Sequence, residues 1–317
     1  MALAETRTWL RGPVVAVATP FADDFGLDLG GLARNVEFMV AGGMTRGQGV
    51  LLVGGAAGEF PALNRVERIA VMKASVDAAA GRVPVMTSVQ HTDWREVVAL
   101  AQAAEKAGVA GLQVGVTYYY PATQDDLQRL VELVGRAVSI PLMIYATWWE
   151  GGIKIDGTLL RRLADLPNVE AVKWSAPSVD EFTEGVTAAR DRLVFIDNQG
   201  MYVEGHQLGV AGFVTHVGGF WPEYSLDLWR SLEAADYAGA RDRLATFKPA
   251  WSDWAGRVMA ETGGEGPFIK AALAEVGLSA GPPRPPSVAP SPALQAELKA
   301  LFSSAGVPLA AVAGGRS

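Results

Sequence analysis

The sequence predicts an α/β fold, a (β/α)8 TIM barrel followed by C-terminal helices. Short β-branched runs alternate with longer amphipathic runs along most of the chain, in eight successive pairs. The short runs are apolar on both faces, which is typical of parallel strands covered by helices. The turn G-x-G-x-x-G, which opens many doubly wound sheets, is replaced after the first run by "TPFADDFG". Eight units in series therefore favour a closed barrel.

The predicted elements follow the apolar runs and the local signals between them. Asn64 followed by Glu67 predicts a helix N-cap with a capping box, and Gly81 and Gly108 are expected to end their helices. Strands are expected at 14–19, 49–53, 83–89, 111–115, 141–145, 169–174, 193–197 and 212–216. Helices are expected at 28–41, 65–80, 94–107, 124–137, 157–164, 179–190, 201–208 and 224–235.

After the eight units the pattern becomes helical. We assign residues 1–235 to the barrel, 236–303 to a helical extension packed on it, and 304–317 to a flexible tail. Helices are expected at 236–261, 266–277 and 291–302, with the proline-rich stretch "GPPRPPSVAPSP" as a stiff connector before the last one.

Composition excludes several classes of protein. The chain has 317 residues, of which 50% are hydrophobic and 19% charged, as in ordinary globular proteins. A net charge of −7 argues against a nucleic-acid or anionic-membrane partner. The absence of cysteine excludes disulfides and thiolate chemistry. No apolar segment suits a signal peptide or a membrane span, so a cytoplasmic protein is expected.

Lys173 is the first candidate reactive group, because barrel enzymes carry their chemistry at the C-terminal ends of the strands. It lies between Val172 and Trp174 at the end of the sixth predicted strand. Burial there should lower its pKa towards ~7, the range of catalytic lysines. A neutral amine attacks a ketone and forms a Schiff base. A buried ion pair with Glu170 or Asp197 is the alternative, and the residues alone leave both open.

Two further strand ends carry candidates that can be interpreted in two ways. Tyr145 either caps the core with its hydroxyl in water or moves the proton that imine chemistry requires. The turn "GGAAGEF" at 54–60 either presents bare N–H groups to an anion or is a tight turn and nothing more. His216 and His206 near Asp197 match no metal-binding spacing, so no metal is expected.

In this order, these residues resemble the dihydrodipicolinate synthase / N-acetylneuraminate lyase family over roughly 12–303. "GPVVAVATPF" resembles its first strand, and "GGAAGEFPALNRVER" its G-[ST]-T-G-E-x-x-x-L-x-x-x-E signature. "PLMIYA" carries the family tyrosine as Tyr145, and "PNVEAVKWS" resembles the segment with the Schiff-base lysine, here Lys173. "GPFIKAAL" and "PPRPP" match its C-terminal features.

The resemblance implies a Schiff-base lyase, an aldolase or a dehydratase or hydratase-aldolase, acting on pyruvate or another 2-oxo acid and in some members on an aldehyde. Lys173 would be the nucleophile and Tyr145 the proton-transfer residue, with Tyr119 or Tyr120 contributing from the same or a neighbouring subunit. No cofactor is implied, and a homo-oligomer, tetramer or dimer, is expected. The expected substrate-binding residues are Ala56, Ala57, Gly58, Glu150, Trp148, Asn198, Val214 and Thr215.

Two departures from the family pattern bear on the substrate. Ala56 and Ala57 stand where family hydroxyls would be, so a hydroxyl relay through Tyr145 is not available from this turn. Glu150 stands where the synthases carry an arginine that receives the carboxylate of the aldehyde substrate. A carboxylate would repel that substrate, which argues against true 4-hydroxy-tetrahydrodipicolinate synthase activity.

Aromatic side chains cluster near the predicted site and favour a larger or aromatic acceptor, unless they serve packing. They are Trp148, Trp149, Trp174, the tyrosines at 118–120, Phe220 and Trp221. A sugar acid is a second possibility, because "GEF" resembles the signature of the family's dehydratases, with Glu150, Asn198 and Gln199 as partners for hydroxyls. The competing hypotheses for the function are a true synthase, a metal-dependent barrel lyase and a non-catalytic ligand-binding barrel.

Overall fold

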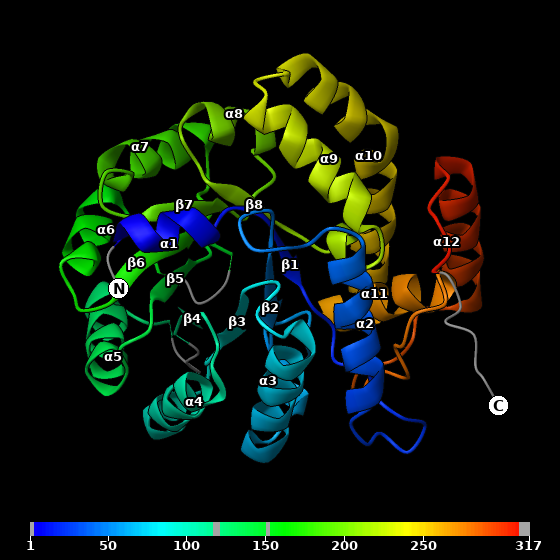
Figure 1. Ribbon diagram of the computed structural model, residues 1–317, viewed down its shortest axis with the longest axis horizontal. Coiled ribbons are helices and arrows are strands. Elements are labelled where there is room, and N and C mark those ends of the chain that lie inside the picture. Colours follow the sequence, from blue (N-terminus) through cyan, green and yellow to red (C-terminus); the bar gives the residue numbers. More distant parts are fainter. Residues whose placement is uncertain (1–2, 117–120, 150–152, 311–317) are drawn as a thin grey trace. The chain divides into compact units, whose positions relative to one another are not determined.

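The computed structural model describes residues 3–116, 121–149 and 153–310. Eight strands form one closed barrel in chain order (Figure 1), which confirms the predicted fold class. From β3 to β8 the neighbouring strands are parallel. The strands are β1 (Gly12–Ala16), β2 (Val50–Val53), β3 (Val85–Ser88), β4 (Gly111–Val114), β5 (Leu142–Ala146), β6 (Val169–Trp174), β7 (Val194–Asp197) and β8 (Gly212–Thr215).

Helices connect the strands and continue beyond the last one. They are α1 (Leu3–Trp9), α2 (Leu29–Ala41), α3 (Arg65–Ala79), α4 (Trp94–Ala107), α5 (Gln124–Ala137), α6 (Gly157–Ala164), α7 (Val179–Ala189), α8 (Tyr202–Gln207), α9 (Pro222–Glu233), α10 (Tyr237–Thr262), α11 (Glu265–Glu275) and α12 (Pro292–Ala305). The Asn64–Glu67 capping box is present at the start of α3. Within the described ranges, none of the helices has the length and apolarity needed to cross a bilayer.

One prediction at the N-terminus was wrong, and one element there was missed. The first strand was expected at 14–19 but spans Gly12–Ala16. Val17 and Ala18, which follow it, are buried but lie outside the strand. Helix α1 was not predicted at all, since it has only seven residues. It is fixed by tertiary packing, with Trp9 buried in the barrel core.

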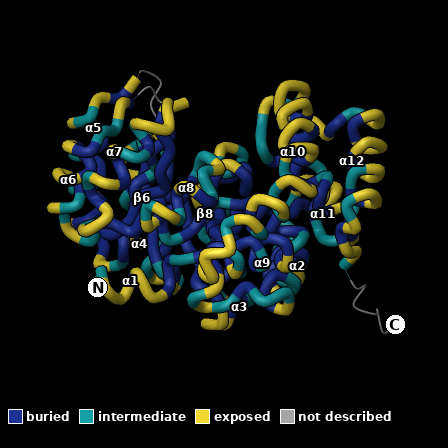
Figure 2. The backbone as a smooth tube through the Cα atoms, turned by 90° about the horizontal axis from the view of Figure 1, so that it is seen from above, coloured by how far each residue is buried: buried dark blue, intermediate teal, exposed yellow. Residues whose placement is uncertain are grey.

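The chain divides into two compact units, and the first comprises residues up to 14, 45–52 and 81–214. Its strand residues are buried except for Tyr145 and Val214, which are half-buried, while its helices alternate between buried and exposed residues (Figure 2). One core cluster fills its interior: Trp9, Leu10, Val14, Val50, Leu52, Met86, Met143, Ala171, Val194 and Ile196. Because side chains alternate along a strand, this cluster identifies the inward-pointing residues of the strands that contribute to it.

Trp174 lies on the opposite, outward face of β6. Its ring packs edge-on against Phe195 with centroids 6.2 Å apart, and its Nε1 donates a hydrogen bond of 3.2 Å to the carbonyl of Phe182 on α7. The expectation that Trp174 lines the substrate pocket is therefore wrong. Strand alternation assigns it to the packing between β6 and α7.

The second unit comprises residues 15–44, 53–80 and those from 215 onward. Aromatic rings of α9 to α12 and the preceding turn form its core. Phe220 lies 5.0 Å from Trp251 and 5.1 Å from Phe302, and Trp221 lies 5.5 Å from Phe247, between ring centroids. Phe220 and Trp221 thus serve packing, the alternative considered for them above.

A buried ion pair in this unit fixes the turn that follows β2. Glu59 has a left-handed backbone, with φ of 55°, and its carboxylate lies 2.8 Å from Nζ of Lys270 on α11. Nζ also donates to the carbonyl of Pro282 at 3.0 Å and lies 3.7 Å from the ring centroid of Phe21. Burial raises the pKa of the Glu59 carboxyl and lowers the pKa of Lys270 to about 8, each against the opposing effect of its partner.

Replacing Gly185 by Ala should destabilise the protein. A Cβ at this position would come within 2.2 Å of Cζ2 of Trp174, so β6 or α7 would have to shift. Overpacking of this kind typically costs about 1–3 kcal/mol. Gly256→Ala is the matched control, because its Cβ would meet nothing within 4 Å and alanine favours the helix. Chemical denaturation should show a lower free energy of unfolding for Gly185→Ala and no decrease in this free energy for Gly256→Ala.

Replacing Lys270 by Met should also destabilise the protein, by about 3–5 kcal/mol, because it leaves a buried carboxylate without its cation. Lys299→Met, at an exposed position, should change the free energy of unfolding by about 0.5 kcal/mol or less. Between pH 8 and 10.5 the folded chain has released the Lys270 proton, while the unfolded chain still holds it. Unfolding free energy should therefore rise across this window, less so in Lys270→Met. If the unfolding free energy of the unmodified protein and that of Lys270→Met changed equally with pH, this prediction would be contradicted.

Candidate active site

Lys173 and Tyr145 are neighbours on the inner face of the barrel. The β5–β6 register pairs Tyr145 with Lys173, and each lies two residues beyond a member of the core cluster, Met143 and Ala171. Lys173 is 8% exposed, and its Nζ lies 4.3 Å from the centroid of the Tyr145 ring. This geometry places an amine and a phenol side by side at the C-terminal ends of two adjacent strands.

Asp197, one of the two carboxylates considered as ion-pair partners of Lys173, belongs to the outward face of its strand. Glu170, the other carboxylate considered, lies at a β-bulge, because Leu142 pairs with Val169 and Met143 pairs with Ala171, so the register passes over Glu170. Asp197 follows Ile196, a member of the inner cluster, and therefore shares the outward face with Phe195. Its Oδ1 accepts hydrogen bonds from the amides of Gln199 and Gly200, at 2.7 and 3.2 Å, and shapes the turn after β7.

A polar layer continues along the inner face beside Tyr145. Gln90 Oε1 accepts hydrogen bonds from Ser88 Oγ at 3.1 Å and from Gln113 Nε2 at 3.3 Å, and all three residues are buried. Gly115 brings this layer against the tyrosine, because a Cβ there would lie 3.1 Å from Cβ of Tyr145 and 3.5 Å from Nε2 of Gln90. These residues were not predicted from the sequence, although alternation along "GLQVG" directs Gln113 to the same face as Gly111.

The turn after β2 belongs to the second unit. It presents two backbone N–H groups that donate no hydrogen bond within the described residues. Gly58 N–H donates to the carbonyl of Gly55 at 3.0 Å, and the Gly58 carbonyl accepts from the Thr19 hydroxyl at 2.8 Å. A Cβ on Gly58 would lie 3.0 Å from the nitrogen of Gly54, so the turn requires glycine. Within the described ranges, the N–H groups of Ala56 and Ala57 donate no hydrogen bond.

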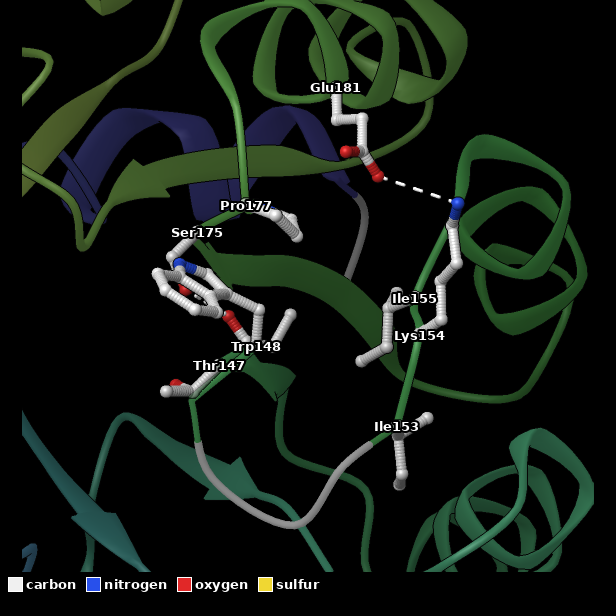
Figure 3. Close-up of a pocket in the computed structure, with 9 residues that line it drawn as sticks. Thr147, Trp148, Ile153, Lys154, Ile155, Ser175, Pro177 and Glu181 are labelled. Carbon is white, nitrogen blue, oxygen red and sulfur yellow. Dashed lines mark hydrogen bonds and ion pairs between the residues drawn. The ribbon is translucent and has the colours of Figure 1, made fainter.

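A pocket of about 290 Å³ lies beyond the end of β5, in the first unit (Figure 3). Trp148 and Ser175 face Ile153 and Ile155 across it, and Glu181 of α7 approaches Lys154. Trp148 is 48% exposed, which is unusual for so large an apolar side chain. The pocket is lined by Ala146, Thr147, Trp148, Ile153, Lys154, Ile155, Ser175, Pro177 and Glu181.

The other predicted site residues have varied surroundings. Val214 packs against the inner core cluster, and the Thr215 hydroxyl lies 3.3 Å from the Ser225 hydroxyl and accepts from Gly218 N–H at 3.3 Å. Asn198 is half-buried, with its N–H bonded to the carbonyl of Trp174. The amide oxygen of Gln199 accepts from Ala176 N–H at 2.7 Å, so it is already engaged in the turn.

Two of the histidines have structural partners within the described residues. His216 lies 3.6 Å from the Glu265 carboxylate and packs on Phe268, while His91 Nδ1 accepts from Asp93 N–H at 2.9 Å and shapes its loop. In the described part of the chain no three His, Asp or Glu side chains are grouped so as to hold a metal ion. Tyr119, Tyr120 and Glu150 lie outside the described residues, so their roles stay predictions.

Comparison with known proteins places this barrel among its relatives. A 4-hydroxy-tetrahydrodipicolinate synthase of Sorangium cellulosum is 31% identical over 73% of this chain and 77% of its own length. An uncharacterized DapA-like lyase of Halobacterium salinarum is 30% identical over 87% of this chain and 88% of its own length. The crystal structure of YagE from E. coli K12, in complex with pyruvate, is 25% identical, with a TM-score of 0.83 over 94% of this chain and 99% of that one.

The sequence model described as the dihydrodipicolinate synthetase family matches residues 10–305, nearly the whole described chain. The matched region includes all eight strands, Lys173, Tyr145 and the turn after β2. On this match and on the curated relatives, the chain belongs to the dihydrodipicolinate synthetase family.

Proposed function

We propose that the protein is a lyase that forms an imine between Lys173 and a 2-oxo acid, with pyruvate as the simplest substrate. The observation that carries the proposal is the buried Lys173 amine, 4.3 Å from the centroid of the Tyr145 ring on the inner face of the barrel. The pyruvate complex of the YagE protein supports the choice of substrate. A cytoplasmic homotetramer or dimer is part of the same proposal.

The chemistry follows from the groups at these strand ends. The neutral amine attacks the ketone carbon of the 2-oxo acid, and loss of water gives the imine. When the imine is protonated, it draws electrons from the neighbouring carbon, which then loses a proton and becomes the nucleophile. The face of the Tyr145 ring stabilises the positive charge on nitrogen, and its hydroxyl transfers protons.

We assign the substrate carboxylate to the amides of Ala56 and Ala57. Two adjacent unused N–H groups in a glycine-rich turn form an anion-binding arrangement that needs no side chain. Loops that follow the strands of a parallel barrel carry its substrate site, and this turn follows β2. Gly58 shapes the turn, and Trp148, Asn198, Val214 and Thr215 remain proposed contacts.

A true 4-hydroxy-tetrahydrodipicolinate synthase is the second candidate, favoured by the Sorangium cellulosum relative. Glu150 argues against it, because a carboxylate stands where these synthases carry the arginine for the aldehyde carboxylate. Turnover of pyruvate with aspartate semialdehyde at a rate typical of enzymes, about 1 s⁻¹ or faster, would favour the synthase.

Incubation with pyruvate and sodium borohydride should attach a reduced pyruvate adduct to Lys173, because borohydride traps an imine as a stable amine. Mass spectrometry of the digested protein identifies the modified lysine. Lys173→Ala should lose the adduct, whereas Lys154→Ala, at the pocket rim, should keep it. A folded protein that carries no adduct at Lys173 would reject the lyase mechanism.

Tyr145→Phe should slow the reaction while leaving Lys173 in place, since the ring is kept and the hydroxyl is lost. Loss of a proton-transfer group typically costs about 10²–10⁴ in rate. Exchange of the pyruvate methyl protons with solvent deuterium, followed by NMR, measures this step directly. An exchange rate equal to that of the unmodified enzyme would assign the proton transfer to another group.

A further inference from the structure

Glu59, in the turn after β2, carries two features that cost free energy. Its backbone is left-handed, with φ of 55°, a conformation that residues other than glycine rarely adopt. Its side chain is 8% exposed, and burial raises the pKa of its carboxyl more than the charge of Lys270 lowers it. Strained residues persist where the surrounding structure enforces them, and they gather at functional sites. This combination points to a role for the turn beyond connecting β2 to α3.

Helix α11 holds the Glu59 carboxylate in place. One carboxylate oxygen, Oε2, lies 2.8 Å from Nζ of Lys270, whereas Oε1 has no hydrogen-bond partner among the described residues. Gly266 on the same helix leaves room for the side chain, because a Cβ there would overlap Oε1 and the carbons beside it. Lys270 is itself fixed by the carbonyl of Pro282 and the ring of Phe21. The carboxylate is thus tied to a helix of the second unit.

The backbone of the same residue closes the turn. Glu59 N–H donates to the carbonyl of Ala56 at 2.9 Å. The carbonyl of Gly55 accepts from two N–H groups later in the turn, at 3.0 and 3.3 Å. Both carbonyls therefore point into the turn, and across a trans peptide bond the N–H of the next residue points the opposite way. The N–H groups of Ala56 and Ala57 are thereby aimed out of the turn, away from the atoms that hold it.

We propose that the ion pair between Glu59 and Lys270 positions the two amides that bind the substrate carboxylate. The ion pair fixes the side chain of Glu59, whose own N–H fixes the carbonyl of Ala56. That carbonyl shares a peptide plane with the N–H of Ala57, so the orientation of one sets the other. The inference rests on the proposed function, which assigns the carboxylate of a 2-oxo acid to the amides of Ala56 and Ala57. Glu59 and Lys270 act as positioning residues and need not touch the substrate.

A role in positioning explains the buried ion pair better than a gain in stability does. Two apolar side chains of similar volume often stabilise a fold as well as a buried ion pair does. Burial lowers the pKa of Lys270 to about 8 despite the carboxylate beside it, and Arg284 adds a second positive charge nearby. The ion pair contributes direction instead, because a carboxylate and an ammonium group in contact fix where the turn lies. A small rotation of the turn would misalign both amides with an anion.

Glu59→Ala removes the anchor and leaves Lys173 in place. The rate of covalent trapping with sodium cyanoborohydride is measured for pyruvate and for methyl pyruvate, which has the same ketone without the negative charge. With pyruvate the second-order rate constant should fall about tenfold or more, because hydrogen bonds to a charged group are lost. With methyl pyruvate it should change little, because an ester gains far less from the two amides. A general loss of structure would lower both rates alike.

Two further variants separate the anchor from its charge. Gly266→Ala keeps both charged side chains but displaces the Glu59 carboxylate, so it should show the same selective loss with pyruvate. Glu59→Gln keeps a side-chain oxygen that accepts from Lys270, so its pyruvate rate should stay within about threefold of that of the unmodified protein. Asp253→Ala breaks an exposed ion pair with Arg257 on α10 and, as the control, should change neither rate.

The outcomes distinguish this inference from the proposed function. Equal losses with the two ketones in Glu59→Ala and Gly266→Ala, or no loss with pyruvate, would overturn the positioning role and leave the lyase intact. If pyruvate has no advantage over methyl pyruvate in the unmodified protein, relative to their rates with a free amine, the carboxylate assignment fails and this inference fails with it. If the unmodified protein traps neither ketone, the lyase is rejected as well.

Discussion

The alternation of side chains along β5 and β6 is the constraint on which the candidate site depends. The parallel register pairs Tyr145 with Lys173, and both face the interior above Met143 and Ala171. A slip of one residue on β6 would turn Trp174 inward and Lys173 towards the helices, because alternate residues exchange faces. Packing of Trp174 against Phe195 and α7 opposes that slip. The position of the reactive amine is thus specified largely by a tryptophan on the opposite face.

The two buried lysines discussed above have different surroundings, and the difference separates structure from chemistry. Lys270 lies 2.8 Å from a carboxylate and donates to a carbonyl, so its nitrogen is committed to holding the turn that carries Glu59. Lys173 lies beside a phenol ring, with its Nζ 4.3 Å from the centroid of Tyr145. Burial alone would rank the two lysines alike, at 3% and 8% exposed. Their neighbours make one a structural cation and the other the proposed nucleophile.

Most of the fold could be predicted from the sequence, because the apolar runs and helix caps are strong local signals. The sixth strand was expected at 169–174 and has those bounds, and the capping box at Asn64 starts α3 as predicted. Family membership confirms the expected lyase class. The failures came where tertiary packing decides: α1 is a short helix held by Trp9, and Trp174 was taken for a pocket residue. Thr147, Gln90 and Gln113 were missed because no motif marks them, and the domain boundary at residue 235 stays a prediction.

Polar groups that the fold leaves without a hydrogen-bond partner are an informative signal at this site. The Thr19 hydroxyl donates to Gly58, and the Thr215 hydroxyl contacts Ser225, so both are accounted for by structure. Among the described residues, the Thr147 hydroxyl and the amides of Ala56 and Ala57 are not. A folded chain tolerates the cost of such groups where a ligand later completes them, since native interiors otherwise satisfy nearly all polar atoms. Two adjacent backbone amides without an acceptor suit a carboxylate, because they offer donors and need no side chain.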